Sequence, residues 1–539
     1  MLRYSPKLSS FPEILPSDLL AETLLNLPPK EILRICSEVK GFDRGCSQDT
    51  FWKRVWLKWV SPRLPNWSNE EIKNEISRRV EESKRLTPVD LLKQGSQNGI
   101  LFYVIEALER GADISFWDNW ALREAAANGH LNIVQYLVAF GADVSAEKDD
   151  ALRRAAARGH LDVVKYLVEL GANVSARNNE ALRLAAENGH LDVVKYLVES
   201  GADVFAIEEE VLLGAAFHGH LDVIEYLVES GANLSAIKDD ALRWAAAYGY
   251  LDVVEYLVEK GANVSADDNL ALRYAAANGH LDVVKYLVEN GADVSAEDNE
   301  ALRAAAERGH FEIVKYLVES GANVSARNNE ALRRAAANGH LNIVQYLGKE
   351  GADISANENE ALLLASVYGH LDVVEYLVES GADVSALENE ALRFAAANGH
   401  LDIVSYLVEN GADVSARENE ALRWAAERGY LDVVKYLVES GADVSANDDE
   451  ALRKAARNGH LDVVKYLVDK GADISARDDE ALRRAAANGY LHVVKYLVEK
   501  GANVSANNNE AYWMASHYGH SHVVNYLISL GVDPRGLYH

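Results

Sequence analysis

Residues 178–206 read NNEALRLAAENGHLDVVKYLVESGADVFA, and closely similar stretches recur along the chain. The tripeptide ALR begins at positions 121, 151, 181, 241, 271, 301, 331, 391, 421, 451 and 481, with variants at 211, 361 and 511. The period is therefore 30 residues, without an insertion or deletion. Such regularity is typical of stacked helical units, because each unit must bury its apolar face on the next one. We expect a repeat array in these 539 residues, and not one compact core.

Each unit predicts two short helices joined by a turn. Asn178 or Asn179 can cap the first helix, which ends at Gly189. The second helix begins near Leu191, and Gly201 ends it before an extended link to the next unit. The expected apolar faces are Ala181, Leu182, Ala185 and Ala186 in the first helix, and Leu191, Val194, Leu197 and Val198 in the second.

The segment NGHLDVVKYLVESGAD, residues 188–203, resembles the core of the ankyrin repeat. The resemblance covers residues 91–539 and implies an all-α, ankyrin-type helix–turn–helix solenoid of about 15 shortened repeats. These start at 91, 121, 151, 181, 211, 241, 271, 301, 331, 361, 391, 421, 451, 481 and 511. Similar units occur in ankyrin proteins of giant DNA viruses.

Two departures from the family pattern bear on recognition. E-A-L-R replaces the usual T-P-L-H opening, and each unit is three residues shorter than the family's 33. All three are missing where the family forms a projecting β-hairpin finger. The finger is therefore expected to be a tight turn, and the recognition surface to lie on the first helices and turns of the concave face.

One position of the first helix differs strongly between units, for example Glu124, Gly214 and Trp244. A buried position would not accept all three, so it is expected to face solvent or a ligand. Large apolar residues at and beside this position form two groups, and clustered exposed aromatics are typical of binding hot spots. The predicted target-binding residues are Ile207, Phe217, Ile237, Trp244, Tyr248 and Tyr274, with Leu213 beside them, and then Leu364, Tyr368, Leu387, Phe394 and Trp424.

Two alternatives stay open for these groups. The apolar residues either bind a partner or fill the space left by the shortened finger. Gly348 interrupts the second helix of its unit between the two groups, either as neutral drift or as a hinge.

Recurring charged and titratable residues have simpler structural explanations. Arg183, like its equivalents, follows an acidic residue by three positions and is expected to form an i, i+3 ion pair. The recurring histidines are expected in turns and too far apart to share a metal ion. The C-terminal His517, His520 and His522 are expected to belong to a polar terminal repeat. We expect no cofactor, no metal site and no catalytic residue.

Charge is distributed unevenly along the chain. Residues 1–90 contain 15 Lys and Arg against 13 Asp and Glu, whereas the remainder contains 39 against 70. A net charge of about −31 on the repeats makes nucleic acid a poor partner. The acidity serves either solubility or attraction of a basic protein.

Cysteine usage and hydropathy suggest a location. Cys36 and Cys46 are the only cysteines, so no disulfide framework supports the repeats and a reducing setting is expected. No signal-peptide-like or transmembrane segment is apparent. We expect a monomeric, non-membrane, cytoplasmic protein, in the host cytoplasm if it is viral.

Residues 1–60 do not repeat and predict a small helical domain, joined to the array by a connecting helix within 61–90. This domain resembles the F-box, which docks on the Skp1 subunit of cullin-RING ubiquitin ligases. Glu38 and Thr23 depart from the family pattern. The resemblance implies Skp1-binding residues Leu15, Pro16, Leu19, Leu20, Leu24, Leu27, Ile32 and Leu33. Alternatively, the domain only caps the first repeat.

Two functions follow from these features. In the first, the chain is a substrate receptor that links a target on the ankyrin concave face to a Skp1–cullin ubiquitin ligase. In the second, it is a scaffold or competitor without a ligase partner, whose N-terminal domain is only a cap. No phosphate-binding loop or nucleophile motif favours an enzyme.

Overall fold

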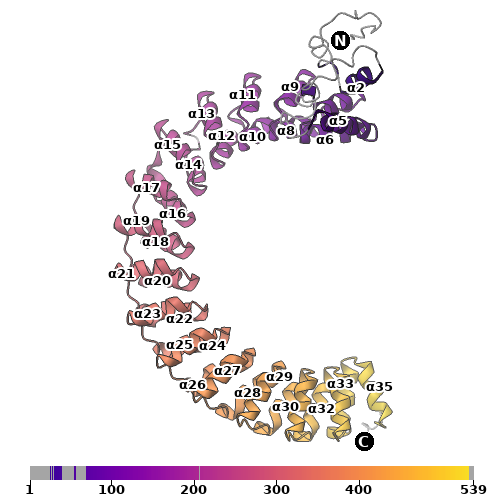
Figure 1. Ribbon diagram of the computed structural model, residues 1–539, viewed down its shortest axis with the longest axis vertical. Coiled ribbons are helices and arrows are strands. Elements are labelled where there is room, and N and C mark those ends of the chain that lie inside the picture. Colours follow the sequence, from indigo (N-terminus) through magenta and orange to yellow (C-terminus); the bar gives the residue numbers. More distant parts are fainter. Residues whose placement is uncertain are drawn as a thin grey trace, which may run out of the picture. The chain divides into compact units, whose positions relative to one another are not determined.

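A computed structural model of the chain describes Leu25, Leu27 and residues 29–38, 54–55, 68–205 and 207–532. The described residues contain helices and no strands, so the predicted all-α repeat fold is confirmed. They belong to two compact units, Met1–Asn263 and Val264–His539. Within each unit, the two helices of a repeat lie side by side, and successive pairs stack on one another (Figure 1).

The first helices in the first unit are α6 (Pro88–Asn98), α8 (Phe116–Ala127), α10 (Ala146–Ala157), α12 (Ala176–Glu187), α14 (Glu208–Phe217) and α16 (Lys238–Tyr248). Their partners are α7 (Leu101–Glu109), α9 (Leu131–Ala139), α11 (Leu161–Glu169), α13 (Leu191–Glu199), α15 (Leu221–Glu229) and α17 (Leu251–Glu259). A 3-10 helix, η2 (Leu234–Ala236), precedes α16.

The first helices in the second unit are α18 (Ala266–Asn278), α20 (Ala296–Arg308), α22 (Ala326–Ala337), α24 (Ala356–Tyr368), α26 (Ala386–Asn398), α28 (Ala416–Arg428), α30 (Ala446–Arg457), α32 (Ala476–Ala487) and α34 (Ala506–His517). Their partners are α19 (Leu281–Glu289), α21 (Phe311–Glu319), α23 (Leu341–Lys349), α25 (Leu371–Glu379), α27 (Leu401–Glu409), α29 (Leu431–Glu439), α31 (Leu461–Asp469), α33 (Leu491–Glu499) and α35 (Ser521–Ser529).

The core of each repeat is built from the apolar faces that the sequence predicts. Ala181, Leu182, Ala185 and Ala186 of α12 are all buried, and small alanines let neighbouring first helices pack closely. In α13 the buried residues are Val193, Val194 and Leu197, whereas Leu191 and Val198 are half-buried. Val193 therefore belongs to the buried face of α13, for which the sequence predicts Leu191, Val194, Leu197 and Val198.

Histidines at the start of the second helices join consecutive repeats. His190 Nε2 lies 3.2 Å from the carbonyl oxygen of Ala157, and its ring covers Gly159, where a Cβ atom would lie 2.5 Å from the ring. Burial lowers the pKa of the equivalent His160, which favours the neutral ring as a donor to the carbonyl of Ala127. These histidines are structural, as predicted.

A left-handed turn precedes most first helices. In α20, Glu297, Asp298 and Asn299 have φ values of 50°, 53° and 61°. Left-handed backbone costs about 1–2 kcal/mol per residue, although Asn and Asp tolerate it better. The buried Asn299 accepts a 2.7 Å hydrogen bond from the backbone N–H of Asn323 in the next repeat. This contact offsets part of the cost and joins two repeats.

Asn178 and Asn179 do not act as the predicted N-caps. Both lie in the left-handed turn, with φ values of 58° and 56°. Asn179 Oδ1 accepts a hydrogen bond of 2.9 Å from the backbone N–H of Asp203 in the next repeat. The asparagine therefore stabilises the stacking of repeats and not the start of its own helix.

Besides the first repeat, whose α6 follows Thr87 with a φ of −70°, two described repeats have no left-handed turn before the first helix. Ile207 and Ile237 occupy the position of Glu297, and their φ values are −139° and −120°. A β-branched residue strongly disfavours left-handed backbone, so α14 and α16 begin directly after these isoleucines. Both side chains turn inward and are 2% and 4% exposed. Contrary to the expectation from sequence, neither isoleucine is therefore exposed, although Ile207 is among the residues that line a pocket.

The segment before the first repeat packs as a helical cap. The connecting helix α5 (Asn69–Ser83) buries Ile72, Ile76 and Val80, the face that the sequence predicted. The hydroxyl of Tyr103 in α7 donates to the carbonyl of Arg79 in α5 at 3.2 Å. Arg110 donates to the carbonyls of Ser83 and Leu86, so α5 is attached firmly to the first repeat.

Few of the F-box-like residues can be located. Leu15, Pro16, Leu19, Leu20 and Leu24 lie outside the described residues. Helix α2 (Pro29–Glu38) contacts α5, and its Ile32 is fully buried, so Ile32 is not accessible to a Skp1-like partner. Leu27 and Leu33 are half-buried.

Cys36 is disulfide-bonded, so its thiol is not free. No helix among the described residues is long and apolar enough to cross a membrane.

Candidate functional site

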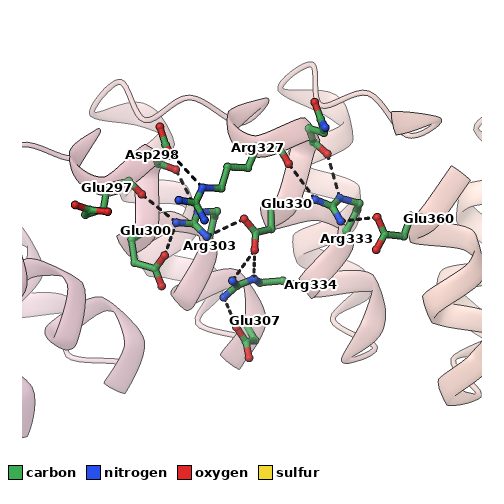
Figure 2. A network of polar contacts seen from close by, with 11 residues as sticks. Glu297, Asp298, Glu300, Arg303, Glu307, Arg327, Glu330, Arg333, Arg334 and Glu360 are labelled. Carbon is green, nitrogen blue, oxygen red and sulfur yellow. Dashed lines mark hydrogen bonds and ion pairs between the residues drawn. The ribbon is translucent and has the colours of Figure 1, made fainter. Parts of the chain in front are cut away.

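Arginines of the first helices form a ladder of ion pairs between repeats (Figure 2). Arg303 Nη1 lies 2.7 Å from Glu330 Oε2 of the next repeat, 27 positions further on. Its other nitrogens donate to the carbonyls of Asp298 and Glu297 in the left-handed turn, at 3.2 and 2.9 Å. Arg303 is 1% exposed. One buried side chain therefore stabilises both the turn and the stacking.

The same pairing recurs within both units. The predicted i, i+3 pairs do occur, for example between Arg153 and Asp150 at 2.8 Å, but the contact to the next repeat is the recurring one. The inter-repeat pairs are Arg123–Asp150, Arg153–Glu180, Arg303–Glu330, Arg333–Glu360, Arg393–Glu420, Arg423–Glu450, Arg453–Glu480 and Arg483–Glu510.

The ladder is interrupted at the repeat that contains Ile207. Arg183 turns to Glu187 of its own helix, at 2.5 Å, and does not reach the next repeat. Glu210, the expected acceptor, is exposed and has no ion-pair partner among the described residues. Leu213 replaces the arginine of this repeat, so it offers no cation to Asp240. Asp240 pairs instead with Arg243 of its own helix, at 2.5 Å.

A pocket of about 590 Å³ lies at this interruption. We call it the Trp244 pocket, and it is lined by Glu187, Glu210, Leu213, Gly214, Phe217 and Trp244, among others. The Phe217 ring lies 5.4 Å from that of Trp244 and 4.7 Å from that of Tyr248, centroid to centroid. Tyr248 is 45% exposed, while Leu213, Phe217 and Trp244 are half-buried. The three aromatic rings form one cluster, of which Phe217 and Trp244 line the pocket.

The absence of a side chain at Gly214 leaves room for Glu187 of the preceding repeat. A Cβ atom at this position would lie 2.7 Å from Cγ of Glu187. The glycine therefore lets Glu187 cross the floor of the pocket and reach Arg183.

A second pocket, of about 790 Å³, lies in the other unit. This Trp424 pocket is lined by Val367, Phe394, Ala397, Trp424, Glu427 and Arg428, among others. The rings of Phe394 and Trp424 are 5.3 Å apart. Glu427 is paired with Lys454 at 2.7 Å, whereas Arg428 donates only a 3.3 Å hydrogen bond to Asn398. The lining therefore has no unpaired carboxylate.

The remaining predicted residues are placed as follows. Tyr368 and Leu387 are 60% and 46% exposed, and Leu364 is half-buried. Tyr274 is 39% exposed and lies in the second unit, so it is not placed relative to the Trp244 pocket. The sequence therefore identified the aromatic residues of both pockets, but it did not identify Glu210, whose importance depends on the interrupted ladder.

Neither the C-terminal histidines nor Gly348 adds a further site. His520 and His522 lie 3.0 and 2.9 Å from the carbonyls of Ala487 and Gly489. In the described part of the chain, no group of three or more His, Cys, Asp or Glu could hold a metal ion. Helix α23 continues through Gly348, whose missing side chain leaves room for the hydroxyl of Tyr376.

Comparisons with known proteins identify the repeats. The family described as ankyrin repeats (3 copies) matches residues 122–208, 184–268, 212–298, 264–328, 296–358, 332–418, 362–448, 392–478 and 452–536. Among solved structures, the human ASB11 ankyrin repeat domain is 26% identical, with a TM-score of 0.35, and the match covers 38% of this chain and 98% of that one. No curated protein matches the chain.

Proposed function

Because the chain belongs to the ankyrin-repeat family, we propose that its first helices bind a partner protein through the Trp244 and Trp424 pockets. The family itself indicates a role in protein–protein interaction, typically as a non-enzymatic scaffold. The observation that supports these positions most strongly is the clustering of half-exposed aromatic rings beside pockets. Such rings carry most of the binding energy in many interfaces.

The test compares partner capture by the full chain and by the double variant Trp244→Ala, Trp424→Ala. We expect the variant to lose the proteins that the wild type enriches from a lysate, because each ring contributes about 2 kcal/mol or more once a partner encloses it. Phe140→Ala serves as the matched control, since Phe140 is an exposed aromatic at the end of a second helix.

Thermal unfolding separates binding from folding. Both variants are expected to unfold close to the wild-type temperature. Unchanged capture by the double variant would contradict the proposal, and so would a large loss of stability, because the rings would then serve the core.

A finer proposal is that residues 1–60 link the bound target to a Skp1–cullin ubiquitin ligase. Its support is the F-box resemblance, together with α2 lying beside the cap helix α5. We expect the full chain to co-purify with Skp1 and the variant Leu19→Asp, Leu24→Asp to lose it. If Skp1 binds neither protein, the segment is not a ligase adaptor, and the alternative of a scaffold with a helical cap is favoured.

A further inference from the structure

Glu210 occupies the acceptor position of the ion-pair ladder, but no arginine of the preceding repeat pairs with it. At eight other junctions among the described repeats, the equivalent acid receives a guanidinium from the preceding repeat. Here the preceding arginine, Arg183, is held by Glu187. The carboxylate of Glu210 thus lines the Trp244 pocket while exposed to solvent. It can accept a cation from outside the chain.

The aromatic rings beside Glu210 favour the same charge. The negative faces of Trp, Tyr and Phe rings attract Lys and Arg side chains. The Trp244 ring already has one guanidinium nearby, because Arg243 lies 5.8 Å from its centroid. A second cation entering the pocket would find Phe217, Trp244 and Glu210 among the residues that line it.

Two arginines also line the pocket, but their charges are compensated. Arg183 lies 2.5 Å from Glu187 and 3.9 Å from Glu180, and Arg177 lies 4.0 Å from Glu180. Both arginines therefore already have acidic partners. The carboxylate of Glu210, in contrast, is exposed and has no cationic partner among the described residues.

The surrounding repeats are strongly acidic. Residues 207–260 contain eleven Asp and Glu against three Lys and Arg. Glu225 and Glu255 stand where the second helices of many other repeats carry lysine, as at Lys195. An acidic surface attracts basic segments and raises their association rate, an effect that salt weakens.

We infer that the Trp244 pocket binds a Lys or Arg side chain from an extended basic segment of the partner protein, with Glu210 as its counter-ion. The inference rests on the proposed protein-binding function and adds the chemistry of the partner. The partner's cation takes the position that the preceding arginine occupies at the regular junctions. The Trp424 pocket does not share this preference, since its Glu427 is already paired with Lys454.

The experiment measures binding of a defined probe to the full chain by isothermal titration calorimetry at low and physiological salt. The probe is a twelve-residue peptide of Gly and Ser with four spaced arginines. A second peptide carries citrulline in place of arginine, which keeps the shape and removes the charge. We expect the arginine peptide to bind at least tenfold more tightly, with a difference that decreases as salt is added.

Matched variants then test Glu210 itself. We expect Glu210→Gln to weaken binding of the arginine peptide about tenfold, and Trp244→Ala to weaken it similarly. Glu209→Gln is the control, because Glu209 is also exposed and adjacent in sequence, and Glu427→Gln is the control in the other pocket. Both controls should change the affinity by less than twofold.

Two results would overturn the inference. One is equal binding of the arginine and citrulline peptides; the other is equal weakening by Glu209→Gln and Glu210→Gln, which would indicate general acidity and no specific site. Either result would leave the proposed function intact if the double tryptophan variant still lost its captured partner. Circular dichroism of each variant checks that the fold is retained.

Discussion

The repeat around Arg303 and the repeat around Ile207 have the same core but different surfaces. In the first, Arg303 bonds both to the carbonyls of the left-handed turn and to Glu330 of the next repeat. Few polar groups therefore remain for a partner to bind. In the second, Ile207 is buried, the turn is absent and Glu210 stays exposed. The comparison shows that incomplete pairing between repeats leaves an acidic side chain exposed, and we propose that binding occurs at such a repeat.

The largest expected effect is the loss of a regular ladder arginine. Arg303→Leu should destabilise α20 and α22 by about 3 kcal/mol, since removing one partner of a buried ion pair is strongly destabilising. Arg183→Leu should cost below about 1 kcal/mol, because Arg183 pairs only within its own repeat and is more exposed. Hydrogen exchange of peptides from each region measures local opening. Equal effects of the two substitutions would show that the ladder does not stabilise stacking.

A smaller effect is expected for the residue that opens the first helix. Ile207→Asn should destabilise α14 by about 2 kcal/mol, because a buried aliphatic side chain is lost. Leu387→Asn should be neutral or slightly stabilising, since Leu387 is exposed and left-handed, with φ of 49°. Urea denaturation of each variant, followed by hydrogen exchange, tests the contrast. A loss at both positions would mean that the left-handed turn depends on apolar packing.

The smallest effect concerns Asp449, which stands where most repeats carry asparagine. Burial raises the pKa of Asp449, whose Oδ1 accepts a hydrogen bond of 2.8 Å from Asp473 N–H. Because the pKa of Asp449 is raised in the folded state, its carboxyl group stabilises the fold most at low pH. This stabilisation is lost as the pH rises through the folded-state pKa. Asp449→Asn should therefore raise the urea midpoint slightly at pH 7, and the gain should shrink below about pH 4. A gain of the same size at both pH values would exclude the charge as its cause.

The helices and their buried faces could be predicted from sequence because the period of 30 repeats the same pattern many times. Ala181, Leu182 and Leu197 are buried as that pattern requires. The aromatic residues Phe217, Trp244 and Trp424 were identified because a variable position reveals which side of the helix does not form the core. Their proximity to one another needed the structure.

The left-handed turn could not be predicted. Residues such as Arg327, Asn328 and Asn329 resemble the polar start of an ordinary helix, and three consecutive left-handed residues are rare. Without the turn, the sequence could not show that Arg303 bonds to its carbonyls, nor that Ile207 would be buried where the turn is missing. Glu210 was missed for the same reason, because an unpaired acid looks like a paired one in sequence.

The contacts between repeats join positions at fixed offsets, as Asn179 with Asp203, Arg303 with Glu330 and His190 with Ala157. Removing thirty consecutive residues from the array would consequently recreate equivalent partners. After an in-frame deletion of residues 328–357, Arg303 would meet Glu360 in place of Glu330, and His370 would cover Gly309 in place of His340. Unequal recombination between repeats could thus shorten or lengthen this protein by whole repeats, and so change the number of repeats in the sequence between its two pockets without removing the residues that line either one.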